Sequence, residues 1–180
     1  KFFNSFGGRR YIITQSLKKL KQSDKEWALD TEDSFFELGS NKRVKFSDME
    51  REKVYYREEP LPIKESDDQR LIVTYSPLYA AYQKRIREKQ VKRASSMIET
   101  GKLKKTRRNP NDPARFISKL STTENGEAAT NELFMIDENK IEQESKYDGF
   151  YGICTNLEDD ARDIISVNER RWEIEESFRI

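Results

Sequence analysis

Arg171 and Glu175 form a charged pair at a spacing that brings two helical side chains together. The arginine stands one helical turn before the glutamate, and side chains at i and i+4 touch on a helix surface. The arginine also interrupts an apolar stripe at helical spacing, made of Ile164, Val167, Arg171, Ile174 and Phe178. Taken alone, the pair is explained as an ordinary helix salt bridge worth about 0.3–0.5 kcal/mol. A chemical role therefore needs further support.

Metal chemistry in this chain has to use carboxylates. There is no histidine, and Cys154 is the only cysteine. This excludes histidine-based acid–base triads, zinc sites built from His or Cys, and an internal disulfide. Carboxylate oxygens suit hard cations such as Mg²⁺ or Mn²⁺. Two such ions roughly 3.5–4 Å apart stabilise the attacking and leaving oxygens when a phosphodiester is cut or transferred.

A second candidate is the one strong local excess of positive charge, between Tyr82 and Arg108. Eleven basic residues stand there against Glu88 and Glu99: Lys84, Arg85, Arg87, Lys89, Lys92, Arg93, Lys102, Lys104, Lys105, Arg107 and Arg108. Such residues give salt-dependent, largely sequence-independent affinity for DNA phosphates. The alternative is a solvated helix face followed by a linker, which is common for charge runs. Tyr79 and Tyr82 are expected to pack in a core rather than stack on bases.

The overall composition narrows the class of protein without naming a partner. The chain has 180 residues with 34 Lys plus Arg against 33 Asp plus Glu, so net charge does not argue for nucleic acid. Apolar residues make up 34% and charged residues 37%, which predicts long solvated helices or segments that need a partner. With no run of about 18 apolar residues and no signal peptide, the cytoplasm is the expected location, without a membrane partner. The start at Lys1 and the stop at Ile180 inside a helical pattern suggest that both ends are cut.

Strands and helices alternate along the first hundred residues. Residues 10–16 are predicted as a buried strand, and Ser23 with Glu26 as a capping box before a short helix. Three short strands are expected at 34–38, 43–46 and 53–57, and another at 71–75. Pro77 starts a helix that reaches about Thr100, with an apolar stripe formed by Leu78, Tyr82, Ile86, Ala94 and Met97.

The second half is predicted as loops, a short helix, a strand and a C-terminal helix. Residues 101–113 and 122–130 are expected to be loops, and 132–136 a strand. Asp137 caps a short helix through Glu144, and Asp148 with Gly149 forms a turn before a strand at 150–155. Cys154 is a small core residue in that strand. A capping box of Thr155 and Glu158 opens a helix from about Leu157 to the end.

The C-terminal residues resemble a known family. The blocks YDGFYGICTNL (147–157) and NERRWEIEESFR (168–179) are similar to bacterial insertion-sequence transposases of the family-four (DDE) group. In that family a Tyr, two residues, an Arg, three residues, a Glu, six residues and a Lys mark the helix with the catalytic glutamate. The resemblance places the Arg at Arg171 and the Glu at Glu175, while Asn168 stands at the Tyr position and the Lys position falls beyond Ile180. Residues 11–13 and 16–21 are also similar to the strand that follows the family's second catalytic aspartate, which would precede Lys1.

The resemblance implies a fold and a division of the chain. The expected class is α/β with mixed α+β content: a partial ribonuclease-H-like core, a β-rich insertion and a long C-terminal helix. Residues 1–30 would end the first part of the core, 31–136 would form the β-rich and helical insertion, and 137–180 would return to the core with the Glu-bearing helix.

The resemblance also implies an activity. Glu175 would be catalytic and a ligand of Mg²⁺ or Mn²⁺, and Arg171 would orient it or contact phosphate. The partner would be double-stranded DNA at transposon ends, with a homodimer of the full-length protein, in the nucleoid of the bacterial cytoplasm. Because both aspartates are missing, the 180 residues alone are expected to be inactive. A non-catalytic DNA-binding module and a decayed transposase remnant remain as alternatives.

Overall fold

A computed structural model describes residues 9–61, 69–101, 103, 111–122 and 128–170. They have mixed α+β content, as expected, and the chain divides into two compact units. Unit 1 combines Lys1–Tyr79 with Gly149–Ile180, and unit 2 is Ala80–Asp148. The boundaries expected near residues 30 and 136 concern the relation to the family's core and stay predictions.

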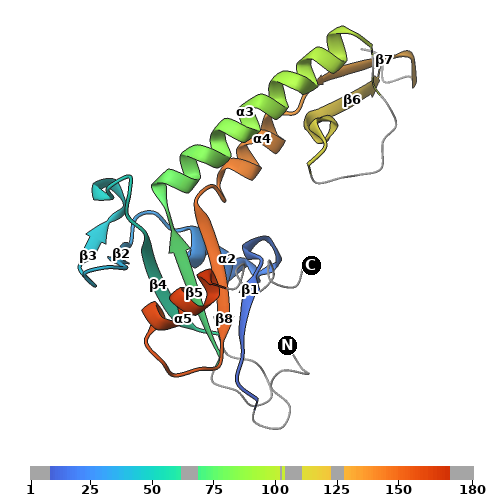
Figure 1. The fold of residues 1–180 in the computed structure, drawn as a ribbon. Coiled ribbons are helices and arrows are strands. Elements are labelled where there is room, and N and C mark those ends of the chain that lie inside the picture. The colour runs from blue at the N-terminus through green and yellow to red at the C-terminus, as the bar shows by residue number, and fades with distance from the viewer. Residues whose placement is uncertain (1–8, 62–68, 102, 104–110, 123–127, 171–180) are drawn as a thin grey trace, which may run out of the picture. The chain divides into compact units, whose positions relative to one another are not determined.

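Unit 1 is built on a six-stranded sheet (Figure 1). Its strands are β1 (Ile12–Gln15), β2 (Ser34–Glu37), β3 (Arg43–Lys45), β4 (Tyr55–Pro60), β5 (Arg70–Tyr75) and β8 (Phe150–Thr155). Their order in space is β1-β8-β5-β4-β2-β3, and every neighbouring pair is antiparallel. In the central strand β5, Leu71, Ile72 and Val73 are all fully buried. Three consecutive buried residues point to alternate faces, so both faces of the sheet must be covered there.

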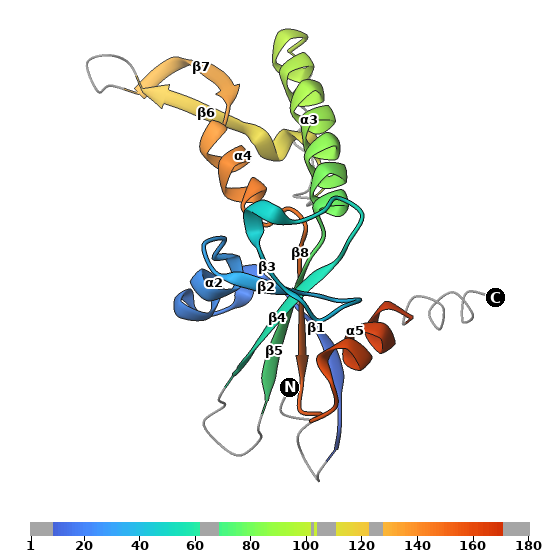
Figure 2. The same cartoon turned by 90° about the vertical axis from the view of Figure 1, so that its left-hand side faces the viewer.

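Helices lie on both faces of this sheet. α5 (Ala161–Glu169) lies on one side and α2 (Gln22–Leu29) on the other (Figure 2). The core beneath α5 consists of Tyr56, Ile72, Ile153, Ala161, Ile164 and Ile165. On the α2 side, four aromatic rings pack at centroid distances from 4.6 to 6.5 Å: Phe35, Phe46, Tyr75 and Phe150. Phe35 is fully buried and the other three rings are partly buried. Full burial of a large apolar side chain supplies about 1.5–3 kcal/mol before chain entropy is counted, so both layers stabilise the sheet.

Unit 2 contains most of the longest helix and a separate β-hairpin. The helix α3 (Pro77–Glu99) begins at Pro77, as predicted. The hairpin pairs β6 (Ile117–Thr122) with β7 (Ala128–Ile136), and α4 (Glu138–Ser145) follows it. Ala94 of α3 and Phe116 before β6 are fully buried and provide the apolar interior of the unit. No helix in the described parts of the chain combines the length and the apolar character that crossing a bilayer requires.

Several local predictions are confirmed. Asp137 caps α4 by accepting a hydrogen bond from the Lys140 N–H at 2.9 Å. Gly149 adopts φ +79°, a conformation that favours glycine, and turns the chain into β8. Cys154 in that strand is fully buried. The strand at 71–75 is present as β5, and α3 ends one residue before Thr100.

Both predicted capping boxes are wrong. The cap of α2 is Lys21, without a side-chain hydrogen bond, and the Ser23 hydroxyl donates to Asp24 instead. Helix α5 begins at Ala161 rather than at Leu157, and its cap is Asp160, which accepts from the Arg162 N–H. Thr155 is buried in β8, where its hydroxyl donates to the Tyr11 carbonyl. Thr155 therefore forms a hydrogen bond with a distant residue instead of capping the helix, as the local pattern had predicted.

Three further predictions are corrected. Residues 122 and 128–130 belong to β6 and β7 rather than to a loop. Leu78, Tyr79 and Tyr82 are 43–49% exposed, so these residues of α3 do not pack in a core. Val167 is 58% exposed, because α5 turns Ala161, Ile164 and Ile165 toward the sheet instead.

Candidate functional site

The predicted catalytic pair, Arg171 and Glu175, lies outside the described residues. Helix α5 ends at Glu169, with Arg170 as its C-cap. Among the residues that are described, no group of three or more His, Cys, Asp or Glu side chains is placed to hold a metal ion. These residues therefore do not fit a two-ion site by themselves. The predicted role of Glu175 as a metal ligand stays a prediction.

The two segments that carry the resemblance lie next to each other in the sheet. β1 comes from the N-terminal segment and β8 from the C-terminal block, and they pair from Ile12 opposite Thr155 to Gln15 opposite Gly152. About 140 residues of chain separate the two strands in sequence. The fold thus brings the N-terminal similar segment against one of the two similar C-terminal blocks, and most of the other block, 168–179, lies outside the described residues.

Hydrogen bonds of Asn156 and Thr155 stabilise this pairing at the end where Ile12 lies opposite Thr155. Asn156 is buried, accepts from the Tyr11 N–H at 2.9 Å and donates to the Arg9 carbonyl at 2.8 Å. The Thr155 hydroxyl donates to the Tyr11 carbonyl at 2.7 Å. Because Tyr11, Thr155 and Asn156 are buried, a shift in register would leave polar groups of these residues unsatisfied. The register of β1 against β8 is therefore strongly specified.

A cavity of about 720 Å³ opens on the α5 side of the unit 1 sheet, beside the end of that helix. Its apolar lining includes Val54, Ile153 and Ile165. Its polar lining includes Thr14, Thr74, Ser76, Tyr151, Asn168 and Glu169. A largely apolar lining with a few polar groups is typical of ligand sites.

Three elements meet at the hydroxyl of Tyr151 in this cavity. The Tyr151 hydroxyl of β8 lies 2.5 Å from the Thr14 hydroxyl of β1. The Asn168 side-chain amide of α5 lies 3.5 Å from the same oxygen. The Asn168 Oδ1 atom is buried and has no hydrogen-bond partner among the described residues. The cavity therefore contains polar groups whose hydrogen-bonding capacity is only partly used.

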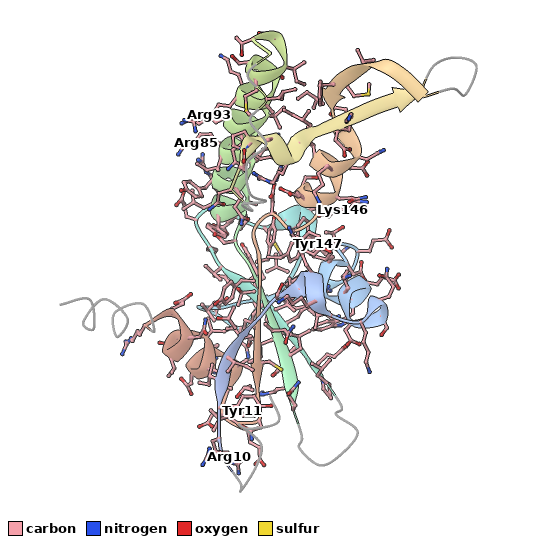
Figure 3. The ribbon with its side chains drawn as sticks, turned by 90° about the vertical axis from the view of Figure 1, so that its right-hand side faces the viewer. Arg10, Tyr11, Arg85, Arg93, Lys146 and Tyr147 are labelled. Carbon is pink, nitrogen blue, oxygen red and sulfur yellow. The ribbon has the colours of Figure 1, made fainter. Side chains whose placement is uncertain are left out.

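The described part of the predicted DNA-binding set lies on α3. Five of its cations are exposed to solvent: Lys84, Arg85, Lys89, Lys92 and Arg93. Figure 3 shows Arg85 and Arg93 projecting from α3 away from the β6–β7 hairpin. Successive side chains four residues apart on one helix face are separated by about 6 Å along the axis. The other predicted contacts lie outside the described residues: Lys102, Lys104, Lys105, Arg107 and Arg108.

Arg87 differs from its basic neighbours because it faces the interior of unit 2. Its guanidinium donates two hydrogen bonds, of 2.6 and 2.5 Å, to the two carboxylate oxygens of Asp148. The two side chains are only 11% and 16% exposed. The hydrogen bonds to Asp148 raise the pKa of Arg87 above its ordinary value. Asp148 was predicted only as a turn former, and its second role as an ion-pair partner was missed.

Arg57, a buried arginine in β4, was not predicted as a notable residue. It is 4% exposed, and its guanidinium lies 4.7 Å from the Trp27 ring centroid and 4.4 Å from that of Phe35. None of its three side-chain nitrogens has a hydrogen-bond partner among the described residues. Burial lowers the pKa of Arg57, although Asp30, Asp33 and Glu59 oppose that shift. Cation–π contacts with both rings offset part of the desolvation of this charge.

Comparison with known proteins adds no relative: no family model, no curated protein and no solved structure matches the chain.

Proposed function

We propose that the chain is the C-terminal part of an insertion-sequence transposase of the DDE type. In the full-length protein Glu175 would complete a site for Mg²⁺ or Mn²⁺, in which DNA is cut and joined at the ends of the element. The fold in this proposal is a ribonuclease-H-like core, of which unit 1 would contain a part. The two catalytic aspartates are expected in sequence that precedes Lys1.

The observation that carries the proposal is the pairing of β1 with β8. Residues 11–13, which are similar to the family, overlap β1, and the similar block 147–157 contains β8. In a transposase of this type the carboxylates must converge although they come from distant parts of the chain. Adjacent strands from both similar segments supply the kind of scaffold that such convergence requires.

The basic face of α3 supports DNA as the substrate. Arg85, Lys89 and Lys92 recur at spacings of four and three residues, so they lie along one side of the helix. Phosphate contacts of this kind position a protein on DNA without reading its sequence. Within the proposal, unit 2 holds the DNA backbone, while recognition of the element ends comes from elsewhere.

The proposal is tested by Glu175→Gln in the full-length protein. The substitution keeps the size of the side chain and removes its negative charge, so metal-dependent strand cleavage should be lost while binding to the element ends is retained. Arg171→Ala tests the second residue of the pair and should also lower cleavage. Cleavage at the unmodified rate by Glu175→Gln would contradict the proposal.

The exposed basic face of α3 also favours a second candidate, a DNA-binding module without catalysis. The two candidates predict different results for the full-length protein. A transposase cuts DNA at defined ends when Mg²⁺ is added, whereas a binding module shows salt-dependent affinity and no cleavage at any metal concentration. The gene sequence upstream of the Lys1 codon gives a direct check, because only the first candidate requires two aspartate motifs there.

A further inference from the structure

The cavity beside the end of α5 presents negative charge without positive charge. Glu169 contributes a carboxylate to its lining, and the described residues that line it include no Lys or Arg. An anion bound there would lie near this carboxylate with no cation to balance the repulsion. The lining therefore favours a ligand that is cationic or rich in hydrogen-bond donors.

Asn168 supplies a hydrogen-bond acceptor that is not used within the protein. Its Nδ2 group donates to the Tyr151 hydroxyl at 3.5 Å, which leaves the Oδ1 atom as the free end of the amide. This oxygen is buried and accepts no hydrogen bond from the described part of the chain. A buried acceptor without a donor loses its hydration with nothing in return. The residue as a whole is only partly buried, so a small rotation of its side chain presents Oδ1 to a ligand that brings an N–H group.

Two tyrosine rings and an apolar floor complete the site. Tyr79 and Tyr151 both line the cavity and are 47% and 37% exposed. Aromatic faces attract cations, and the planar guanidinium also stacks on them, which a compact ammonium does not. Val54, Ile153 and Ile165 offer apolar surface, along which long basic side chains bury their methylene stems. The site thus suits a cation that has a planar head and an apolar stem.

We propose that this cavity binds an alkylguanidinium group, the group that ends an arginine side chain. The Glu169 carboxylate and the Asn168 Oδ1 atom accept hydrogen bonds from its N–H groups, and the stem lies on the apolar floor. A guanidinium has five N–H donors in one plane and no acceptor, so it matches a site with several oxygens and one carboxylate. The inference does not depend on the proposed transposase activity, because every residue it uses belongs to unit 1 of the described chain.

A titration of the 180-residue chain with Nα-acetyl-L-arginine N-methylamide tests the site. In two-dimensional NMR spectra the side-chain amide signals of Asn168 should shift and should saturate at about millimolar ligand, an affinity expected of a small ligand with one partly exposed ion pair. The corresponding citrulline derivative is the matched control ligand, because it has the same shape without the charge. It should bind about fivefold more weakly.

Substitutions on α5 assign the binding to this cavity. Glu169→Gln keeps the size of the side chain and removes its charge, so it should weaken binding by about twofold to fivefold. Asp163→Asn is the matched control, because it removes the same charge from an exposed position of α5 that does not line the cavity. It should leave the affinity unchanged. Asn168→Asp adds a second carboxylate to the lining and should strengthen binding.

The outcomes are distinct. The inference is overturned if no signal shift saturates, if the citrulline derivative binds as tightly as the arginine derivative, or if Glu169→Gln and Asp163→Asn lose equal affinity. A lysine derivative of equal affinity overturns the choice of a guanidinium. Free L-arginine, titrated in parallel, distinguishes two sources: tighter binding than the blocked derivative assigns a free amino acid, and weaker binding assigns an arginine side chain of a polypeptide. None of these results changes the transposase proposal, which DNA cleavage by the full-length protein tests.

Discussion

Gly152 is the position at which β1 and β8 leave no room for a side chain. A Cβ atom built there would lie 2.6 Å from the Gln15 carbonyl oxygen and 2.7 Å from the Leu17 Cδ2 atom. The first of these neighbours is backbone and belongs to the partner strand. The absence of a side chain at this residue thus allows the two similar segments to approach each other.

Gly152→Ala is therefore expected to destabilise unit 1. The added methyl group must push β1 away from β8, and overpacking of this kind costs roughly 1–3 kcal/mol. Gly39→Ala is the control, because a Cβ there meets nothing within 4 Å, and it should change stability by less than about 0.5 kcal/mol. Urea unfolding of both variants measures the difference. Equal stability of the two variants would show that β1 does not lie against β8 as described.

Residue types predicted the local roles of side chains better than they predicted which distant side chains those side chains contact. Asp137, Gly149 and Cys154 take the cap, turn and core positions that their chemistry favours. Arg87 was grouped with its basic neighbours because composition does not reveal which side of a helix faces inward. The cavity around Tyr151 depends on three elements that only the fold brings together, so the sequence alone did not predict it.

Among the elements, α3 has one face with exposed cations and another face that packs inside unit 2. Arg85, Lys89 and Lys92 are exposed, whereas Arg87 is committed to Asp148. Substitutions that look equivalent in the sequence should therefore have different effects. The sequence predicted the extent of α3, because proline and glycine mark its limits. It predicted the inward face only in part, because Ala94 of the expected stripe is buried whereas Leu78 and Tyr82 are exposed.

Arg85→Ala and Arg87→Ala make this contrast measurable in the 180-residue chain. Arg85→Ala should weaken DNA binding uniformly across sequences and reduce the salt slope by about 1, with unchanged unfolding. Arg87→Ala should leave Asp148 unpaired and cost about 2 kcal/mol, less than for a fully buried pair because both side chains are partly exposed. Fluorescence anisotropy at several salt concentrations and urea unfolding test the pair. The contrast fails if Arg87→Ala matches Arg85→Ala in both measurements.

Helix caps give a second prediction at this scale. Asp137→Ala removes the hydrogen bond to the Lys140 N–H and should destabilise unit 2 by about 1 kcal/mol. Ser23→Ala should have almost no effect, because Ser23 lies inside α2 and caps nothing. The pattern of a capping box is identical for real and false caps, and only the tertiary partners decide between them. If Ser23→Ala lowered the thermal unfolding midpoint more than Asp137→Ala does, Ser23 would cap α2 after all.

At the scale of the whole molecule, the order of the strands is the feature that sequence periodicity does not contain. Residues 10–16, 71–75 and 150–155 were each predicted as strands, but their periodicity is the same whichever neighbour they pair with. The sheet places β8 between β1 and β5, so that strands from the N-terminal and C-terminal parts of unit 1 lie side by side. Before the structure, only the family resemblance related residues 11–21 to residues 147–157. The hairpin β6–β7 was not predicted, because the polar residues around its turn have the pattern of a loop.

A crystal structure of the full-length protein with element-end DNA and Mn²⁺ would decide whether Glu175 completes a divalent-ion site. The account predicts an anomalous Mn²⁺ peak about 2.1 Å from a Glu175 carboxylate oxygen, a normal distance for small divalent ions. Two aspartates from sequence before Lys1 should share that ion. A Glu175 carboxylate in open solvent, with the ion bound elsewhere or absent, would contradict the account.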